Sequence, residues 1–178
     1  MRTLFFLILF TSSALSQEQN TFVLYGNLGV GLSRGGFGES TWGPSSRLGV
    51  TIGYDRFLLK VDRTVNNEIM FFEPPEKVSS YSALLGVSFQ PFDHLPELRV
   101  NGKYGIGKGE MIKRGKVTRY NYFDTEYELL TEKYSSNLVE IDAELRFKAV
   151  GLYVGWFTEH SQWYTIYGIT VGAIFGIL

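Results

Sequence analysis

The sequence has no cysteine, and among its 178 residues it has only two histidines and five prolines. Without cysteine the chain forms no disulfides, offers no thiolate nucleophile and cannot be lipidated on a cysteine. The two histidines, His94 and His160, are far apart, which disfavours a structural metal site. The formal net charge of −1 lacks the basic excess typical of nucleic-acid binding. We therefore expect no cofactor, no metal and no nucleic-acid partner.

Long apolar runs are also scarce. The main one, Leu4–Phe10, follows Arg2 and precedes small polar residues, which is the layout of a secretory signal peptide. The run is far shorter than the roughly 20 residues that cross a bilayer as a helix. Ala14 and Ser16 place small side chains where signal peptidase needs them for a cut before Gln17.

This pattern predicts two parts of the chain. Residues 1–16 are a signal peptide cleaved near Ser16 and Gln17, and residues 17–178 are one domain. Glycine and aromatic residues are abundant in the sequence, with 20 Gly, 14 Phe and 11 Tyr. Sheet proteins favour or exploit all three residue types, so an all-β fold is expected.

Apolar and polar residues alternate with a period of two in eight segments, and this period is that of a strand with one apolar face. The clearest segment alternates Val139, Ile141 and Ala143 with Glu140 and Asp142. The eight predicted strands cover 22–33, 47–55, 57–64, 81–90, 98–107, 139–148, 152–156 and 167–177.

The connections between these segments alternate in length. Long connections are expected at 34–45, 66–80 and 108–135, with a modest one at 158–163, and short turns at 55–56, 91–97 and 149–151. All five prolines fall in these predicted connections, as expected for residues that cannot donate to a ladder. An even strand number with alternating short turns and long loops predicts an eight-stranded antiparallel up-and-down transmembrane β-barrel.

The alternation also fits a soluble lipocalin-like barrel, because it shows only that one face of each strand is buried. Three features favour the membrane barrel. The polar faces are rich in glycine, which suits the cramped lumen of eight strands. Aromatic residues gather near the strand ends, as a bilayer interface selects. The polar faces also carry charges of both signs that can cancel.

We predict that these charges form a network inside the barrel. Its expected members are Arg47, Lys60, Asp62, Arg99, Lys103, Glu140, Asp142, Glu144 and Arg146. If the fifth and sixth strands pair so that residue numbers sum to about 243, Lys103 faces Glu140 and Arg99 faces Glu144. Cross-strand pairs of opposite charge contribute up to about 1 kcal/mol each, whereas a lone charge sealed inside costs several times more.

With its export signal and eight alternating strands, the chain resembles the small outer-membrane β-barrels, such as OmpX and the membrane domain of OmpA. The resemblance covers residues 17–178 and rests on architecture. It implies residence in the outer membrane of a Gram-negative bacterium, among outer-membrane lipid and lipopolysaccharide. It also implies insertion by the barrel-assembly machinery and a closed barrel that conducts nothing.

The 108–135 connection has basic residues before its middle and acidic residues after it. Folded as a hairpin about Asn121–Asp124, it would place a basic arm against an acidic arm. The residues predicted to meet a protein partner there are Lys113, Arg114, Lys116, Arg119, Tyr120, Tyr122, Asp124 and Glu126. Binding through exposed strand edges is one possibility, contact of the basic arm with lipopolysaccharide phosphates is another, and a solvated loop without a binding role is the third.

The function that this pattern favours is non-enzymatic: a closed barrel that presents loops for envelope integrity, adhesion or association with an envelope complex. One alternative is a lipid A-modifying acyl hydrolase or transferase that uses His160 and Ser161, although no carboxylate can be assigned to orient the imidazole. The other alternative is the soluble lipocalin-like carrier.

Overall fold

The computed structural model describes residues 22–35, 42–68, 76–121 and 124–177. The predicted signal peptide, residues 1–16, lies outside these ranges, as do Pro74, Pro75 and Tyr122. For Tyr120, Asn121, Asp124 and Thr125 only the backbone is described.

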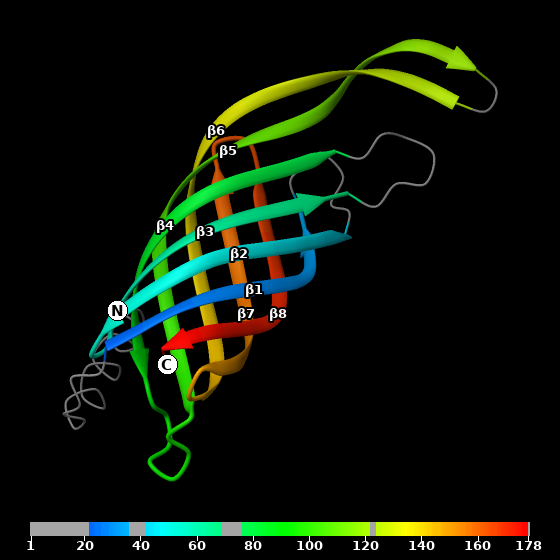
Figure 1. Ribbon diagram of the computed structural model, residues 1–178. Coiled ribbons are helices and arrows are strands. Elements are labelled where there is room, and N and C mark those ends of the chain that lie inside the picture. Colours follow the sequence, from blue (N-terminus) through cyan, green and yellow to red (C-terminus); the bar gives the residue numbers. More distant parts are fainter. Residues whose placement is uncertain (1–21, 36–41, 69–75, 122–123, 178) are drawn as a thin grey trace, which may run out of the picture.

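The chain forms a closed barrel of eight antiparallel strands in which each strand pairs with its neighbours in sequence (Figure 1). The strands are β1 (Phe22–Arg34), β2 (Trp42–Tyr54), β3 (Phe57–Asn67), β4 (Lys77–Phe89), β5 (Leu98–Asn121), β6 (Asp124–Phe147), β7 (Val150–Ser161) and β8 (Thr165–Ile177). β8 pairs with β1 from Leu24 opposite Ile177 to Arg34 opposite Tyr167, which closes the sheet. The predicted fold class is confirmed.

The described residues include no helix that is long and apolar enough to cross a membrane.

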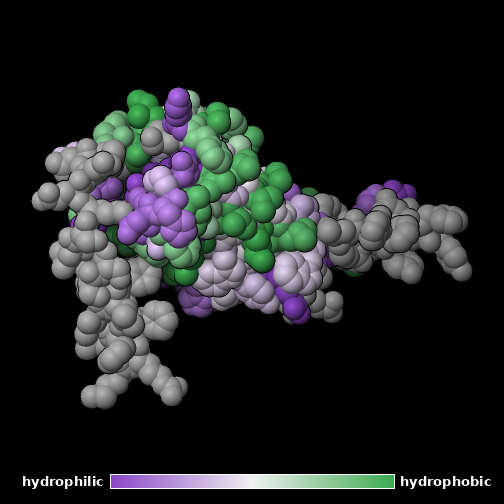
Figure 2. All heavy atoms as spheres, turned by 90° about the horizontal axis from the view of Figure 1, so that it is seen from below, coloured by the Kyte–Doolittle hydropathy of each residue, from purple (hydrophilic) through white to green (hydrophobic). Residues whose placement is uncertain are grey.

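The two faces of the barrel wall differ sharply in chemistry. The outer face carries apolar side chains such as Leu28, which is 56% exposed, and Leu48, which is 61% exposed. Figure 2 shows apolar side chains gathered over the outer wall. The inner face carries buried charged side chains, among them Arg47 and Lys60. This is the reverse of a water-soluble barrel, so the lipocalin-like alternative is wrong.

Short turns join the strands at one end of the barrel, which we call the turn end; the opposite end is the ribbon end. Asp55 and Arg56 connect β2 to β3, and Lys148 and Ala149 connect β6 to β7. The first residue of each pair has a positive φ, 58° at Asp55 and 52° at Lys148. Aspartate tolerates this left-handed region better than most residues.

The strands reach further toward the ribbon end than predicted. β2 begins at Trp42, so Pro44 lies in a strand opposite Leu32 and not in a connection as predicted. It stands near the end of β2, where the loss of one donor disturbs the ladder least.

The largest difference from prediction is at residues 108–135. β5 and β6 run through this segment as a paired ribbon, and Asn121 lies opposite Asp124 at its tip. The predicted hairpin about these residues is therefore correct, whereas its assignment as a loop is wrong. Register shifts interrupt the pairing between Arg114 and Val117 and between Val117 and Arg119. In Figure 1 the ribbon projects well beyond the other strands and bends to one side.

Glycine at two lumen positions makes room for a ring. Gly29 on β1 lies opposite Gly172 on β8. A Cβ on Gly29 would overlap the hydroxyl of Tyr153, and one on Gly172 would crowd the same ring at 2.6 Å. The pair therefore accommodates Tyr153 inside the barrel, as expected where eight strands leave little space.

Candidate functional site

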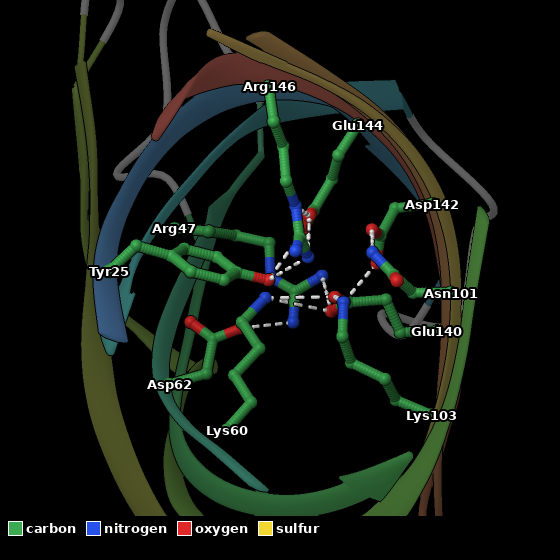
Figure 3. Close-up of polar contacts among 10 residues, drawn as sticks. All are labelled: Tyr25, Arg47, Lys60, Asp62, Asn101, Lys103, Glu140, Asp142, Glu144 and Arg146. Carbon is green, nitrogen blue, oxygen red and sulfur yellow. Dashed lines mark hydrogen bonds and ion pairs between the residues drawn. The ribbon is translucent and has the colours of Figure 1, made fainter. Parts of the chain in front are cut away.

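A network of ion pairs fills the middle of the lumen (Figure 3). Its charged members come from four strands and are Arg47 on β2, Lys60 and Asp62 on β3, Lys103 on β5, and Glu140 and Asp142 on β6. All six side chains are at most 3% exposed. Three cations face three carboxylates, so the group is electrically balanced, as buried charges require.

Glu140 is the centre of this network because it contacts all three cations. One carboxylate oxygen lies 2.9 Å from Nζ of Lys60 and 2.9 Å from Nζ of Lys103. The other lies 2.5 Å from Nη1 of Arg47. Since Arg47 and Glu140 stand on β2 and β6, the contact crosses the lumen between strands that are not neighbours.

The two aspartates complete the network. Asp62 bonds Arg47 and lies 3.1 Å from Nζ of Lys60. Asp142 bonds Lys103 and accepts a hydrogen bond of 2.6 Å from Nδ2 of Asn101. Hydrogen bonds between charged groups are stronger than those between neutral groups. Each of them also gives a buried charge a partner, which avoids the cost of an unpaired charge in the interior.

A second polar group lies nearer the turn end. Tyr25 donates a 2.8 Å hydrogen bond to Glu144, and Nη2 of Arg146 lies 2.6 Å from the same carboxylate. The guanidinium of Arg146 also sits 5.1 Å from the centre of the Tyr25 ring. The group links β1 to β6 across the interior.

The register of β5 and β6 is the one predicted, with Lys103 opposite Glu140 and Arg99 opposite Glu144. Lys103 bonds its partner. Glu144 bonds Arg146 and Tyr25 instead of Arg99. The structure thus brings eight of the nine predicted interior charges into ion pairs and leaves Arg99 half-buried beside them.

Apolar layers lie on both sides of the ion pairs. Toward the turn end Val23, Leu58, Tyr153 and Ile174 pack together with the ring of Tyr25. Toward the ribbon end the layer consists of Val78, Met111, Tyr134, Phe157, Tyr164 and Ile166. All of these side chains are buried, so the barrel interior is packed at both ends.

Glu159 is an interior carboxylate within residues 158–163, which were predicted to form a loop. It is fully buried near the ribbon end and accepts hydrogen bonds from Ser136 at 2.8 Å, Ser80 at 3.1 Å and Tyr134 at 3.4 Å. These neutral hydroxyls satisfy the carboxylate, and among the described residues no cation forms an ion pair with it. Its position two residues after Phe157, on the inner face of β7, is the sequence signal that locates it.

The base of the ribbon is fixed by Arg114. Its guanidinium lies 2.8 Å from a carboxylate oxygen of Glu68 and 3.6 Å from one of Glu76, and its backbone N–H donates a 3.0 Å bond to Glu76. Glu68 and Glu76 follow β3 and precede β4. Arg114 therefore ties β5 to the ends of both strands and holds the ribbon at a set angle.

Charges along the ribbon pair across its two arms. Lys113 lies 2.8 Å from Glu132, and Arg119 lies 3.9 Å from Glu126. Lys116 is exposed. Tyr120 and Asp124 take part in the pairing near the tip through their backbones. Of the predicted partner-binding residues, only Tyr122 lies wholly outside the described part.

The residues of the enzyme alternative do not form a site. His160 is exposed and its Nδ1 lies 2.7 Å from Oγ1 of Thr165, whereas Ser161 is buried and accepts hydrogen bonds from the N–H groups of Trp163 and Tyr164. Neighbouring residues of a strand point to opposite faces, so the two side chains diverge. In the described residues no group of three or more His, Asp or Glu side chains is arranged to hold a metal ion.

Comparison with solved structures places the fold among small outer-membrane β-barrels. Neisserial surface protein A (NspA) superimposes with a TM-score of 0.67 at 11% identity, over 85% of this chain and 96% of that one. Ail, the attachment invasion locus protein of Yersinia pestis, solved in complex with the heparin analogue sucrose octasulfate, gives 0.60 at 12% identity, over 88% and 99%. No protein-family profile and no curated sequence matches this chain. The likeness is therefore one of fold.

Proposed function

We propose that this chain is a non-enzymatic, non-conducting barrel of a Gram-negative outer membrane that presents the β5–β6 ribbon to a protein partner at the cell surface. The main support for this proposal is that the ribbon extends beyond the ends of the neighbouring strands β4 and β7. β5 pairs with β4 only as far as Ile112, and β6 pairs with β7 only from Ser136 toward the turn end.

The outer wall supports residence in a membrane. Its exposed apolar side chains extend around all eight strands. Exposed aromatic residues mark both margins of this belt, with Phe22, Tyr54, Phe57, Phe147 and Phe175 toward the turn end and Trp42, Tyr81, Trp156, Trp163 and Tyr167 toward the ribbon end. Aromatic girdles of this kind stabilise a barrel at the two bilayer interfaces.

The packed interior supports a non-conducting role. An ion that entered the lumen would have to displace Phe157 and its apolar neighbours at the ribbon end, then break the contacts of Glu140 with its three cations. Eight strands enclose only enough space for side chains. The barrel therefore serves as an anchor.

The ribbon has the properties of a surface for strand addition. Beyond Ile112 and before Ser136 each arm has one edge without a barrel strand beside it. Such an edge offers backbone N–H and C=O groups to an incoming strand. Val117, Leu129 and Leu130 are exposed along the arms and add apolar contact area. The Arg114 contacts hold this edge in place before a partner arrives.

Site-specific photocrosslinking in intact cells tests the proposal. A photoreactive amino acid is placed at Thr118 on β5 or at Glu128 on β6, both exposed on the ribbon, and the control position is Leu85 on the lipid-facing wall. We expect discrete protein adducts from the ribbon positions and none from Leu85. Heat-dependent migration on gels confirms that each variant is folded.

A shortened ribbon completes the test. Arg114 and Leu129, which lie opposite each other, are joined through a two-residue Asn-Gly turn, the connection that a tight hairpin prefers. The shortened barrel should reach the outer membrane and show the heat shift. Co-expressed in excess with the full-length protein that carries the photoreactive residue, it should leave the adducts undiminished, whereas an excess of unmodified full-length barrel should compete for the partner and reduce them. A folded, full-length barrel that gives no adduct from either ribbon position would contradict the proposal.

A further inference from the structure

Two cations that have no carboxylate partner among the described residues flank an aromatic ring on the outer wall at the ribbon end. Arg63 on β3 lies opposite Tyr81 on β4, and Tyr81 lies opposite Lys108 on β5. All three side chains are exposed, and the Arg63 guanidinium lies 5.5 Å from the centre of the Tyr81 ring. Among the described residues neither Arg63 nor Lys108 contacts a carboxylate.

An apolar groove begins directly below this row, toward the turn end. The next outward positions on the same three strands are Val61, Ala83 and Ile106. The small side chain of Ala83 between two larger neighbours leaves a depression in the wall. The groove has a volume of about 580 Å³, and Tyr81 and Lys108 form part of its lining.

A second groove, whose lining includes several polar and charged side chains, continues from the same row toward the ribbon. It has a volume of about 730 Å³, and its lining includes Tyr81, Lys108, Glu110, Lys133, Ser135 and Gln162. Tyr81, Lys108 and Ser135 belong to both grooves. Glu110 lies opposite Lys133. One carboxylate therefore stands among Arg63, Lys108 and Lys133, and the surface has a net positive charge.

From these features we infer a binding site for one molecule of a phosphorylated acyl glycolipid of the outer leaflet. Lipid A belongs to this class. An acyl chain occupies the groove over Ala83, the phosphate lies between Arg63 and Lys108, and the sugar extends toward Ser135 and Gln162. The two cations stand on strands two apart, roughly 10 Å between backbones, and their long side chains converge on a phosphate above Tyr81. A zwitterionic phospholipid leaves the excess positive charge of this surface uncompensated.

This inference rests on the proposed outer-membrane location, but its test is separate. The folded protein is placed in phosphatidylcholine nanodiscs that contain a small fraction of bisphosphorylated lipid A, of dephosphorylated lipid A, or of phosphatidylglycerol. Native mass spectrometry measures the lipid that stays bound. The variants are Arg63→Gln with Lys108→Gln, and Ala83→Leu, which fills the groove without a change of charge. The matched control is Lys116→Gln with Arg119→Gln, the same loss of charge on the distant ribbon.

We expect the unmodified barrel and the ribbon control to retain phosphorylated lipid A in preference to the other two lipids. Loss of Arg63 and Lys108 should weaken retention about 30-fold. Each cation near an anionic lipid surface contributes about 1 kcal/mol of binding free energy, and about 1.4 kcal/mol corresponds to a tenfold change in affinity. Ala83→Leu should weaken it as well. Equal retention by all variants, or equal retention of phosphatidylglycerol, would overturn the inference. Neither result bears on the ribbon adducts, which test the proposed function independently.

Discussion

The lumen network and the ribbon share strands β5 and β6 and contain the same kinds of ion pair, yet their surroundings differ. Glu140 in the lumen is 3% exposed at its side chain and contacts three cations. On the ribbon, Arg119 and Glu126 are 66% and 57% exposed and 3.9 Å apart. Water screens the second pair and not the first. Burial thus decides which ion pairs hold the fold together and which remain exposed to water.

The strongest test of this comparison is removal of the central carboxylate. Glu140→Gln leaves three buried cations with two aspartates, so one charge loses its compensation. Breaking a buried pair in this way costs about 3–5 kcal/mol. We expect a large drop in the denaturant concentration at which half of the protein is unfolded. The heat-dependent gel shift measures the folded fraction. Glu126→Gln on the ribbon is the matched control, and equal midpoints for the two variants would refute the distinction.

A second test concerns space in the lumen instead of charge. Gly29→Ala places a methyl group against the ring of Tyr153, whereas Gly102→Ala meets nothing within 4 Å. Overpacking of this kind costs about 1–3 kcal/mol. The Gly29 variant should therefore unfold at a lower denaturant concentration and the Gly102 variant should not. Identical unfolding curves would show that the wall yields to the added methyl.

A third test asks whether the ribbon opens independently of the barrel. Arg114→Ala removes the guanidinium contacts with Glu68 and Glu76 at the ribbon base and keeps the backbone N–H bond to Glu76. Hydrogen bonds to charged groups contribute about 1.5 kcal/mol or more, so ribbon amides should exchange with solvent about tenfold faster while the amides around Glu140 keep their rate. Hydrogen-exchange mass spectrometry makes this measurement, with Lys116→Ala as the control. Faster exchange throughout the barrel would show that the two regions are one cooperative unit.

The smallest effect is expected at the exposed ribbon pair. Arg119→Ala should change the free energy of unfolding by less than about 0.5 kcal/mol, because exposed ion pairs contribute little. The same variant in high salt should behave like the unmodified protein. A destabilisation comparable to that of Glu140→Gln would mean that the ribbon pair is shielded from water.

The alternation of residue types was enough to predict the barrel, because a strand with one apolar face has a period of two and each turn fixes the register of its neighbours. The β5–β6 register followed from matching Lys103 with Glu140. The contact between Arg47 and Glu140 could not be predicted in this way. It joins strands that are not adjacent, and its existence depends on the diameter and stagger of the closed barrel.

The prediction of strands from the sequence failed in the ribbon, where neither face of the strand packs against an apolar layer. Along Lys113–Arg119 polar residues occupy both faces, so the period that identifies a strand disappears although the backbone pairing continues. Glu159 was missed for a different reason, since it is fully buried on the inner face of β7. The end of β7 was assigned to a loop, whereas counting by twos from Gly155 through Phe157 puts Glu159 on the inner face.

The seam between β1 and β8 joins residues from the two extremes of the described chain, with Leu24 opposite Ile177. Until this seam forms, β1 and β8 are two open edges of the sheet, and their pairing removes both. Because the seam joins the strands that are most distant in sequence, we expect its closure to be the slowest pairing step in folding. Once the seam has formed, the order of the strands in the gene is immaterial to the closed ring. A circular permutant opened at the Asp55–Arg56 turn, with the original ends linked, should reach the same barrel.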